Sequence, residues 1–338
     1  MLESVYRLEE KHMLTKHSQQ MKLQPVYSKS LGGRIKDDFK RNWTLYLLVL
    51  PVFVYYVIFM YLPMFGIVIA FQDFKFSARY NFIGNILHSD FVLFDHFKSL
   101  FSSIYFKRVF SNTVRIGVIT LVCSFPVPII LAIMMNELRN EKYKKTTQVM
   151  SYLPHFISMV VVCGMIKDFT SDKGFITIIL SAILGKEPTS MLNDADLFLP
   201  VYVISGIWQN AGWGAIIYTA ALSGVDQSLY EAAAIDGAGR WKQTLHVTLP
   251  SILPTIVIML ILETGSVLNV SYEKILLLYN ELTKSKAEVI NTFVYQRGLI
   301  NRDWSFSTAV SLFNSIISII MVLTVNKICN KLTETSLW

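Results

Sequence analysis

Six long apolar stretches, each bounded by polar residues, constrain this chain more than any other feature of its sequence. A hydrocarbon core about 30 Å thick needs roughly 20 apolar helical residues to cross it, so these stretches are suited to membrane-spanning helices. Of the 338 residues, 53% are hydrophobic and only 16% are charged, which leaves little material for a soluble domain. The sequence therefore predicts an all-α integral membrane protein with six transmembrane helices. The predicted spans are residues 45–71, 112–136, 149–166, 199–222, 252–270 and 308–328.

The polar segments between the spans predict the domain organisation. Residues 1–43 form a cytoplasmic tail, residues 44–330 the transmembrane domain, and residues 331–338 a second cytoplasmic tail. The first 30 residues are polar, so the first span is expected to act as an uncleaved signal-anchor. The apolar run Phe175–Leu184 is too short to cross a bilayer, which favours an interfacial or re-entrant helix.

Basic residues predict the orientation of the spans. Residues 1–43 hold nine Lys and Arg residues, and the short loop 137–147 holds four more. Short loops rich in Lys and Arg stay on the cytoplasmic side. With both ends of the chain inside, the polar segment 223–250 also lies in the cytoplasm. The same flanking charges account for the net charge of +7 without a nucleic-acid partner.

Residues 226–250, hereafter the 226–250 unit, contain the start and stop signals of two short helices. Asp226 is suited to N-cap the first helix, and Val225 to pack on Tyr230 as a hydrophobic staple. Gly237 is expected to end that helix in a left-handed conformation, and Gly239 adds a second break. A small-faced helix between two spans has no packing partner within its own chain, so a protein partner is expected.

The second half of the 226–250 unit leads into the next span. Residues 240–248 are predicted to form a second short helix, and Pro250 opens the fifth span, where its missing N–H costs little. Whether the glycine pair between the halves is a fixed corner or a hinge stays open.

Motifs for covalent chemistry are absent from the sequence. There is no phosphate-binding G-x-x-x-x-G-K-[ST] loop, no His/Glu zinc pattern and no G-x-S-x-G nucleophile motif. The three cysteines fall in or beside apolar stretches and predict neither a disulfide nor a metal site. We therefore expect no catalytic site, no metal and no cofactor on this chain. If the chain moves a solute against a gradient, the energy must come from elsewhere.

The 226–250 unit resembles the EAA loop of bacterial ABC importer permeases, whose signature is EAA, three residues, Gly, nine residues and I-x-L-P. Val247 stands in place of the Ile, while the segment Asp236–Ala238 and Trp241 further match the sugar-permease version. The residues at the signature spacing are Glu231, Ala232, Ala233, Gly237, Val247, Leu249 and Pro250. In that family the loop folds into a coupling helix that docks on a separate ATPase subunit. The resemblance implies docking residues Tyr230, Glu231, Ala232, Ala233, Asp236, Gly237, Ala238 and Arg240.

The resemblance covers residues 35–330 and extends to the LplB-like polysaccharide and oligosaccharide branch of these type I (MalF/MalG-like) permeases. The matching segments are MYLPMFGIVIAFQDFKF (60–76), WQNAGWGAIIYTAAL (208–222), ETGSVLNVSYEKILLLYN (263–280) and INTFVYQRGL (290–299). Ser271 and Tyr272 replace the usual Gly-Phe pair, and Glu263 stands where a basic or neutral residue is expected. Both departures fall near the fifth span, which in this family helps line the transport path.

The resemblance implies a bacterial cytoplasmic-membrane assembly that imports an oligosaccharide. Its partners would be a second, homologous permease subunit in a heterodimer, two ATPase subunits carrying ATP-Mg, and an extracytoplasmic binding protein. Neutral and acidic, uronate-containing glycans both stay open. One alternative is a type I permease for amino acids or phosphate. The other is an ATP-independent channel or carrier, which would not need an ATPase-docking segment such as the 226–250 unit.

Candidate substrate-path residues combine hydrogen-bonding groups with aromatic faces, as carbohydrate recognition requires. The fourth span offers a cluster of such residues, although an aromatic belt or helix packing would explain it equally well. Gly212 and Gly214 are expected to serve close helix packing. A carboxylate within the fifth span needs a partner or a water-filled path, which makes Glu263 functional or paired. The candidates are Trp208, Gln209, Asn210, Trp213, Glu263, Asn269, Tyr272 and Asn314.

Overall fold

Helices dominate the chain from Leu31 to Leu337, the residues that this computed structural model describes. Residues 1–30 of the predicted cytoplasmic tail, and Trp338, lie outside the described residues. The chain divides into two units, residues 1–65 and residues 66–338, each with its own contacts.

The first unit is one long apolar helical segment. Its backbone leaves helical geometry at Asn42 (φ −119°, ψ 22°), whereas Pro51 lies inside the helix. The kink in this helix therefore lies ahead of the proline, where the apolar sequence begins. A π-helical turn precedes Pro63, which has no N–H to continue the regular bonding pattern. The elements are α2 (Leu31–Tyr56), η1 (Val57–Tyr61) and α3 (Leu62–Met64), and the 3₁₀ helix η2 (Phe65–Phe71) begins at the last residue of this unit.

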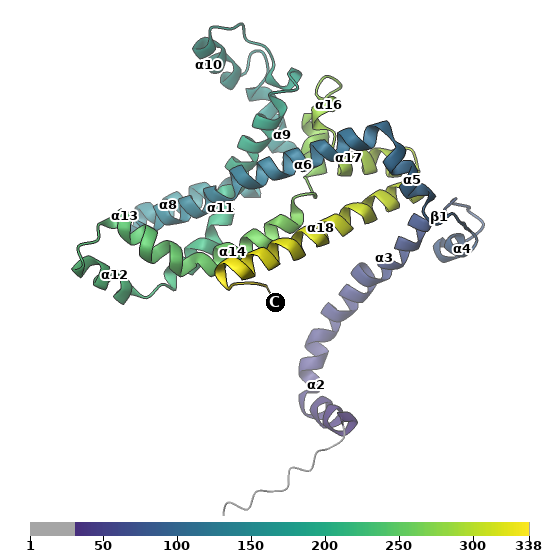
Figure 1. Cartoon of the computed structure of the whole chain (residues 1–338), viewed down its shortest axis with the longest axis horizontal. Coiled ribbons are helices and arrows are strands. Elements are labelled where there is room, and N and C mark those ends of the chain that lie inside the picture. The colour runs from purple at the N-terminus through teal and green to yellow at the C-terminus, as the bar shows by residue number, and fades with distance from the viewer. Residues whose placement is uncertain (1–30, 338) are drawn as a thin grey trace, which may run out of the picture. The chain divides into compact units, whose positions relative to one another are not determined.

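The second unit packs the remaining helices around α11, with α14 and α18 side by side (Figure 1). Residues 72–110 and 271–306, which lie between predicted spans, both contain short helices, and the first of these segments also pairs two short strands. The elements are β1 (Gln72–Asp73), α4 (Phe82–Leu87), β2 (Asp90–Phe91), α5 (Asp95–Ser102), α6 (Ile104–Ser124), α7 (Pro126–Asn136), α8 (Glu141–Tyr152), η3 (Leu153–Phe156), α9 (Met159–Phe169), α10 (Phe175–Leu184), η4 (Met191–Asn193), α11 (Phe198–Ser223), α12 (Gln227–Ile235), α13 (Arg240–Gln243), η5 (Thr244–Thr248), α14 (Leu249–Ser266), α15 (Tyr272–Leu278), α16 (Lys284–Ala287), α17 (Ile290–Val294), η6 (Tyr295–Ile300) and α18 (Trp304–Thr333).

Four described helices are long and apolar enough to cross a membrane: residues 37–71, 104–136, 240–266 and 304–333. The fourth predicted span corresponds to α11, whose 26 residues are long enough to cross. It is not among the four because Gln209 and Asn210 lower its hydropathy. The short apolar run after the third span is a helix with the predicted bounds, α10.

The third predicted span, residues 149–166, contains a sharp bend. The chain bends by 97° between the helical segment 141–156 and α9. Pro154 lies in the 3₁₀ turn η3 ahead of the bend, and the Ser158 hydroxyl then N-caps α9 by accepting from the amide of Val161. A helix end with its own cap satisfies the amides that a bend exposes.

The second span begins at Ile104, well before the predicted Asn112, because distant residues satisfy its polar side chains. Arg108 forms an ion pair with Glu288, which is 6% exposed. The Asn112 amide donates to the carbonyl oxygens of Ser285 (3.0 Å) and Glu288 (3.1 Å). Polar residues that end an apolar run in the sequence thus continue the helix in the folded chain.

We expect Arg108→Ala to lower the free energy of unfolding by about 3 kcal/mol, because it leaves a buried carboxylate without its cation. Thermal unfolding of the purified chain in detergent measures the loss. Replacing both partners, by Arg108→Met with Glu288→Gln, should recover most of it. An equal loss in the single and double variants would contradict a role for the unpaired charge.

Close packing at the middle of α11 depends on glycine, as predicted. A Cβ at Gly212 would lie 2.0 Å from the carbonyl oxygen of Ser151, and one at Gly214 would lie 3.0 Å from Pro128. The backbones of α11 and the segment before the 97° bend therefore touch. Gly214 and Pro128 also line a cavity that is described below.

Candidate functional site

The first half of the 226–250 unit forms the helix that its sequence predicts, α12. The Asp226 carboxylate accepts from the amide of Ser228 at 2.9 Å, and this bond, with a second from the Ser228 hydroxyl, lowers the pKa of Asp226. Val225 and Tyr230 meet in one apolar cluster, which confirms the hydrophobic staple. The helix therefore begins on local signals alone.

The helix α12 ends in a left-handed residue at Gly237, which has a φ of +73°. The amide of Ala238 donates to the Ala233 carbonyl (2.8 Å) and that of Gly237 to the Ala234 carbonyl (3.1 Å), the bond pair of a Schellman motif. Gly239 is instead extended (φ −70°, ψ 168°) and precedes α13. Only one of the two glycines thus needs a conformation that side chains disfavour.

We expect Gly237→Ala to destabilise the end of α12 by about 1 kcal/mol, because nothing blocks a Cβ there and the cost is purely that of a positive φ. Gly239→Ala is the matched control, since its Cβ also meets open space and its φ is negative. Hydrogen exchange at the amide of Ala238 measures the difference. Equal protection in the two variants would contradict the left-handed constraint.

The second half of the 226–250 unit was predicted to be a separate short helix, residues 240–248. In the structure this helix continues without a break into the fifth span. The π-helical turn η5 joins α13 to α14, so that residues 240–266 form one helix. Pro250 lies in the first turn of α14 and cannot donate to the carbonyl four residues earlier. A π turn shifts the bonding pattern by one residue and accommodates this gap.

Three contacts hold the 226–250 unit in place. The Tyr230 hydroxyl lies 3.0 Å from the Thr248 hydroxyl. The Gln243 amide donates to the Ala238 carbonyl oxygen at 3.0 Å. Arg240 pairs with Glu137 at the end of α7, with 3.3 Å between nitrogen and oxygen. The unit is therefore a fixed corner in this structure, tied to α7 and to η5.

The 226–250 unit exposes several large apolar side chains, hereafter its exposed apolar face, that no other described element covers. Ile235 is 86% exposed and Trp241 81% exposed, and Leu229 and Leu245 are also exposed. Exposed apolar side chains on a polar segment indicate a protein contact. Of the predicted docking residues, Tyr230, Ala233 and Ala238 are half-buried, whereas Glu231, Ala232, Asp236, Gly237 and Arg240 are exposed.

A cavity of about 510 Å³, hereafter the polar cavity, lies between α6, α11, α14 and α15. Gln209, Asn210, Trp213 and Glu263 line it, so the structure brings together four of the predicted substrate-path residues. A smaller cavity of about 180 Å³ shares Glu263 with it.

Polar groups of the predicted residues face this cavity with incomplete hydrogen bonding. Gln209 is 4% exposed, and its Nε2 donates to the Ile157 carbonyl while its Oε1 has no partner among the described residues. Asn210 Oδ1 accepts from Nδ1 of His155 at 3.0 Å. The ring of Trp213 stacks on that of His155, with centroids 4.6 Å apart. The side-chain carboxylate of Glu263 makes no hydrogen bond or ion pair with the described part of the chain.

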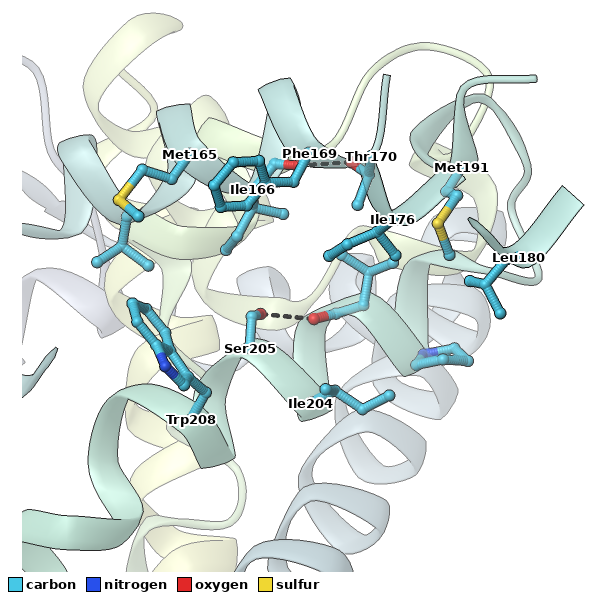
Figure 2. A pocket seen from close by; sticks show the side chains of 13 residues that line it. Met165, Ile166, Phe169, Thr170, Ile176, Leu180, Met191, Ile204, Ser205 and Trp208 are labelled. Carbon is cyan, nitrogen blue, oxygen red and sulfur yellow. Dashed lines mark hydrogen bonds between the residues drawn. The ribbon is translucent and has the colours of Figure 1, made fainter. Parts of the chain in front are cut away.

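The other four predicted path residues lie elsewhere. Trp208 faces a separate, apolar cavity of about 460 Å³ between α9, α10 and α11, opposite Met165 (Figure 2). Tyr272 lines a surface pocket and stacks on Tyr295. Asn269 lines the smaller cavity, where its Oδ1 accepts from Nδ2 of the buried Asn314 at 3.2 Å.

Sequence reasoning missed Lys274, which the prediction counted only as a loop residue. It lies in α15 with 3% of its surface exposed, and it lines the polar cavity. Its ammonium donates to the Tyr202 carbonyl oxygen at 3.0 Å and lies 4.8 Å from the centre of the Tyr202 ring. Burial lowers the pKa of Lys274 to about 8. Its partner is 72 residues away, so no local pattern signals the contact.

Within residues 31–337, no three His, Cys, Asp or Glu side chains come together as metal ligands. The arrangement instead offers a solute cavity and an exposed apolar face at a helical corner. It can bind and move a solute, and it can bind a protein partner.

Known proteins are similar to this chain in sequence and in fold. The sequence profile of the family described as "binding-protein-dependent transport system inner membrane component" matches residues 99–330. Protein LplB of Bacillus subtilis is 40% identical over 93% of this chain and 97% of its own length. The polygalacturonan/rhamnogalacturonan transport system permease protein YteP of the same organism is also 40% identical, over 93% of this chain and 96% of its own.

A solved structure of a bacterial alginate ABC transporter, in complex with an alginate pentasaccharide-bound periplasmic protein, contains a similar chain. The two are 37% identical with a TM-score of 0.80, over 90% of this chain and 100% of the other. The four long apolar helices, the bent pair, the helix α11 and these matches lead to one assignment. The chain belongs to the family of binding-protein-dependent transport system inner membrane components, as a type I ABC permease.

Proposed function

We propose that this chain is one permease subunit of an ATP-driven importer that takes up an oligosaccharide delivered by an extracytoplasmic binding protein. The polar cavity carries the proposal, because it combines the ring of Trp213 with the amides of Gln209 and Asn210. Sugars expose apolar ring faces and many hydroxyl groups, which such a lining matches. Relatives named for polygalacturonan, rhamnogalacturonan and alginate transport add support.

The proposed importer needs protein partners, and one feature of this chain indicates where an ATPase subunit would bind. The exposed apolar face of the 226–250 unit is the proposed docking surface for an ATPase subunit, which would bind ATP-Mg. The other proposed partners are a second, homologous permease, a second ATPase and the binding protein. The proposed location is the bacterial cytoplasmic membrane with both ends of the chain inside.

The geometry suggests how ATPase motion would reach the cavity. Closure of the two ATPases on ATP would carry α12, whose contact with Thr248 passes the displacement to the continuous helix 240–266. Glu263 lies on that helix at the cavity, so rotation of the helix changes the cavity wall. The closed ATPases would favour the outward-facing cavity, and hydrolysis would restore the inward-facing one.

The test is uptake by the complete transporter in proteoliposomes with its binding protein and internal ATP. We expect ATP-dependent uptake of an oligogalacturonide and none of amino acids or phosphate. Uptake of those small solutes instead would favour a different type I permease. Flux without ATP would favour a channel or carrier and contradict the proposal.

A further inference from the structure

The ammonium group of Lys274 is a buried cation with unused hydrogen-bonding capacity. It has three N–H donors, and one is used, by the Tyr202 carbonyl oxygen at 3.0 Å; the described residues provide no partner for the other two. A lysine that is 3% exposed is costly unless a charged or polar partner compensates it.

The polar cavity gives access to this ammonium through a glycine. Gly206, on the helix α11, lines the cavity, and a Cβ built on it would lie 3.4 Å from Lys274 Nζ. No side chain at this position stands between the cavity and the cation. A larger residue at Gly206 would cover the ammonium without touching any backbone.

Unpaired acceptors line the same cavity. The Oε1 atom of Gln209 and the hydroxyl of Thr120 are buried and have no hydrogen-bond partner among the described residues. The carboxylate of Glu263 also lines the cavity, and no ion pair joins it to Lys274 in the described chain. Buried polar atoms are nearly always paired, so these groups indicate a polar ligand.

The chemistry of these groups selects the ligand. The volume of about 510 Å³ is in the range of small-molecule sites. Sugar hydroxyls would donate to Gln209, Thr120 and Glu263, but a neutral sugar leaves the charge of the ammonium uncompensated. A carboxylate compensates that charge and accepts its free N–H donors in short, charge-assisted bonds.

We propose that Lys274 binds a carboxylate of the transported glycan inside the permease, so that the polar cavity selects acidic, uronate-containing oligosaccharides. This inference rests on the proposed function and assigns its charge selectivity to one residue of this chain. Glu263 then orients the sugar, because it repels the carboxylate and accepts from hydroxyl groups.

The test is equilibrium binding to the complete transporter in nanodiscs, without binding protein, by isothermal titration calorimetry. The two probes are trigalacturonic acid and its fully methyl-esterified form, which has the same sugar rings but carries uncharged methyl esters in place of the carboxylates. We expect the wild-type transporter to bind the acid at least about 10-fold more tightly than the ester. Lys274→Gln should remove that preference, and Lys274→Arg should retain it.

Two further variants separate charge recognition from folding. Gly206→Val should weaken binding of the acid and leave Lys274 and its bond to Tyr202 in place. Lys167→Gln removes an exposed lysine of α9 and should leave the preference unchanged.

Equal loss for both probes in Lys274→Gln, or no preference in the wild type, would overturn the inference. Should the ester nevertheless be taken up with ATP, the proposed function stands without it. Should neither probe be bound or transported, both fall.

Discussion

Ile235→Glu is expected to abolish association with the ATPase subunit and with it transport, while membrane insertion stays normal. Ile235 is 86% exposed at the end of α12, next to the Schellman motif, and it makes no contact that the fold needs. A charge buried at an interface without a partner costs several kcal/mol. A loss of about 2 kcal/mol or more, typical of an interface hot spot, weakens association at least about 30-fold.

Copurification of the ATPase with the tagged permease measures this effect. Leu332→Glu is the matched control, because Leu332 is 76% exposed near the end of α18 and lies outside the 226–250 unit. Ala233→Asp, a natural first choice from the EAA signature, is less clean, since Ala233 is half-buried and its carbonyl accepts from Ala238. An Ile235→Glu permease that retains its ATPase normally would refute the docking surface.

Gly212→Ala is expected to lower the stability of the chain strongly. Its Cβ would lie 2.0 Å from the carbonyl oxygen and 2.4 Å from the carbonyl carbon of Ser151, so only a movement of the backbone can relieve the overlap. Overpacking of a rigid contact costs about 3 kcal/mol. The apparent Tm of the detergent-purified chain should fall by roughly 10 °C.

Gly164→Ala provides the opposite expectation in the same molecule. Gly164 lies within α9, and a Cβ there meets nothing within 4 Å. Alanine in a helix interior is about 0.5–1 kcal/mol more favourable than glycine, so this variant should be unchanged or slightly more stable. Similar Tm losses in the two variants would mean that the α11 contact is not what constrains Gly212.

The 226–250 unit could be predicted from sequence because its signals act over a few residues. An N-cap aspartate, a staple pair and a C-terminal glycine each bond within their own turn, and the structure places all three as predicted. The run Phe175–Leu184 could be predicted for a similar reason, since apolar length alone separates a short helix from a span.

Two features of the predicted spans depend on contacts or caps that hydropathy does not register. The helix of the second span begins at Ile104, before the predicted Asn112, and Glu288, 180 residues away from Arg108, compensates the charge of that arginine. The third span was predicted as one apolar stretch, residues 149–166. Hydropathy averages over a window and cannot register a 97° bend set by a proline turn and a serine cap.

The sequence by itself determined that the chain is a helical membrane protein and that the 226–250 unit is a polar helical segment between two spans. Both follow from the sequence because apolar length, helix caps and glycines are local properties. Only the tertiary structure decided which polar residues share a cavity. It moved Trp208 to an apolar cavity and Tyr272 to a surface pocket, and it brought Lys274 beside Gln209 and Glu263. The physical reason is that a buried charge is stable only where polar groups lie close to it. For Lys274 that group is the carbonyl oxygen of Tyr202, 72 residues away, and the two come together only in the folded chain.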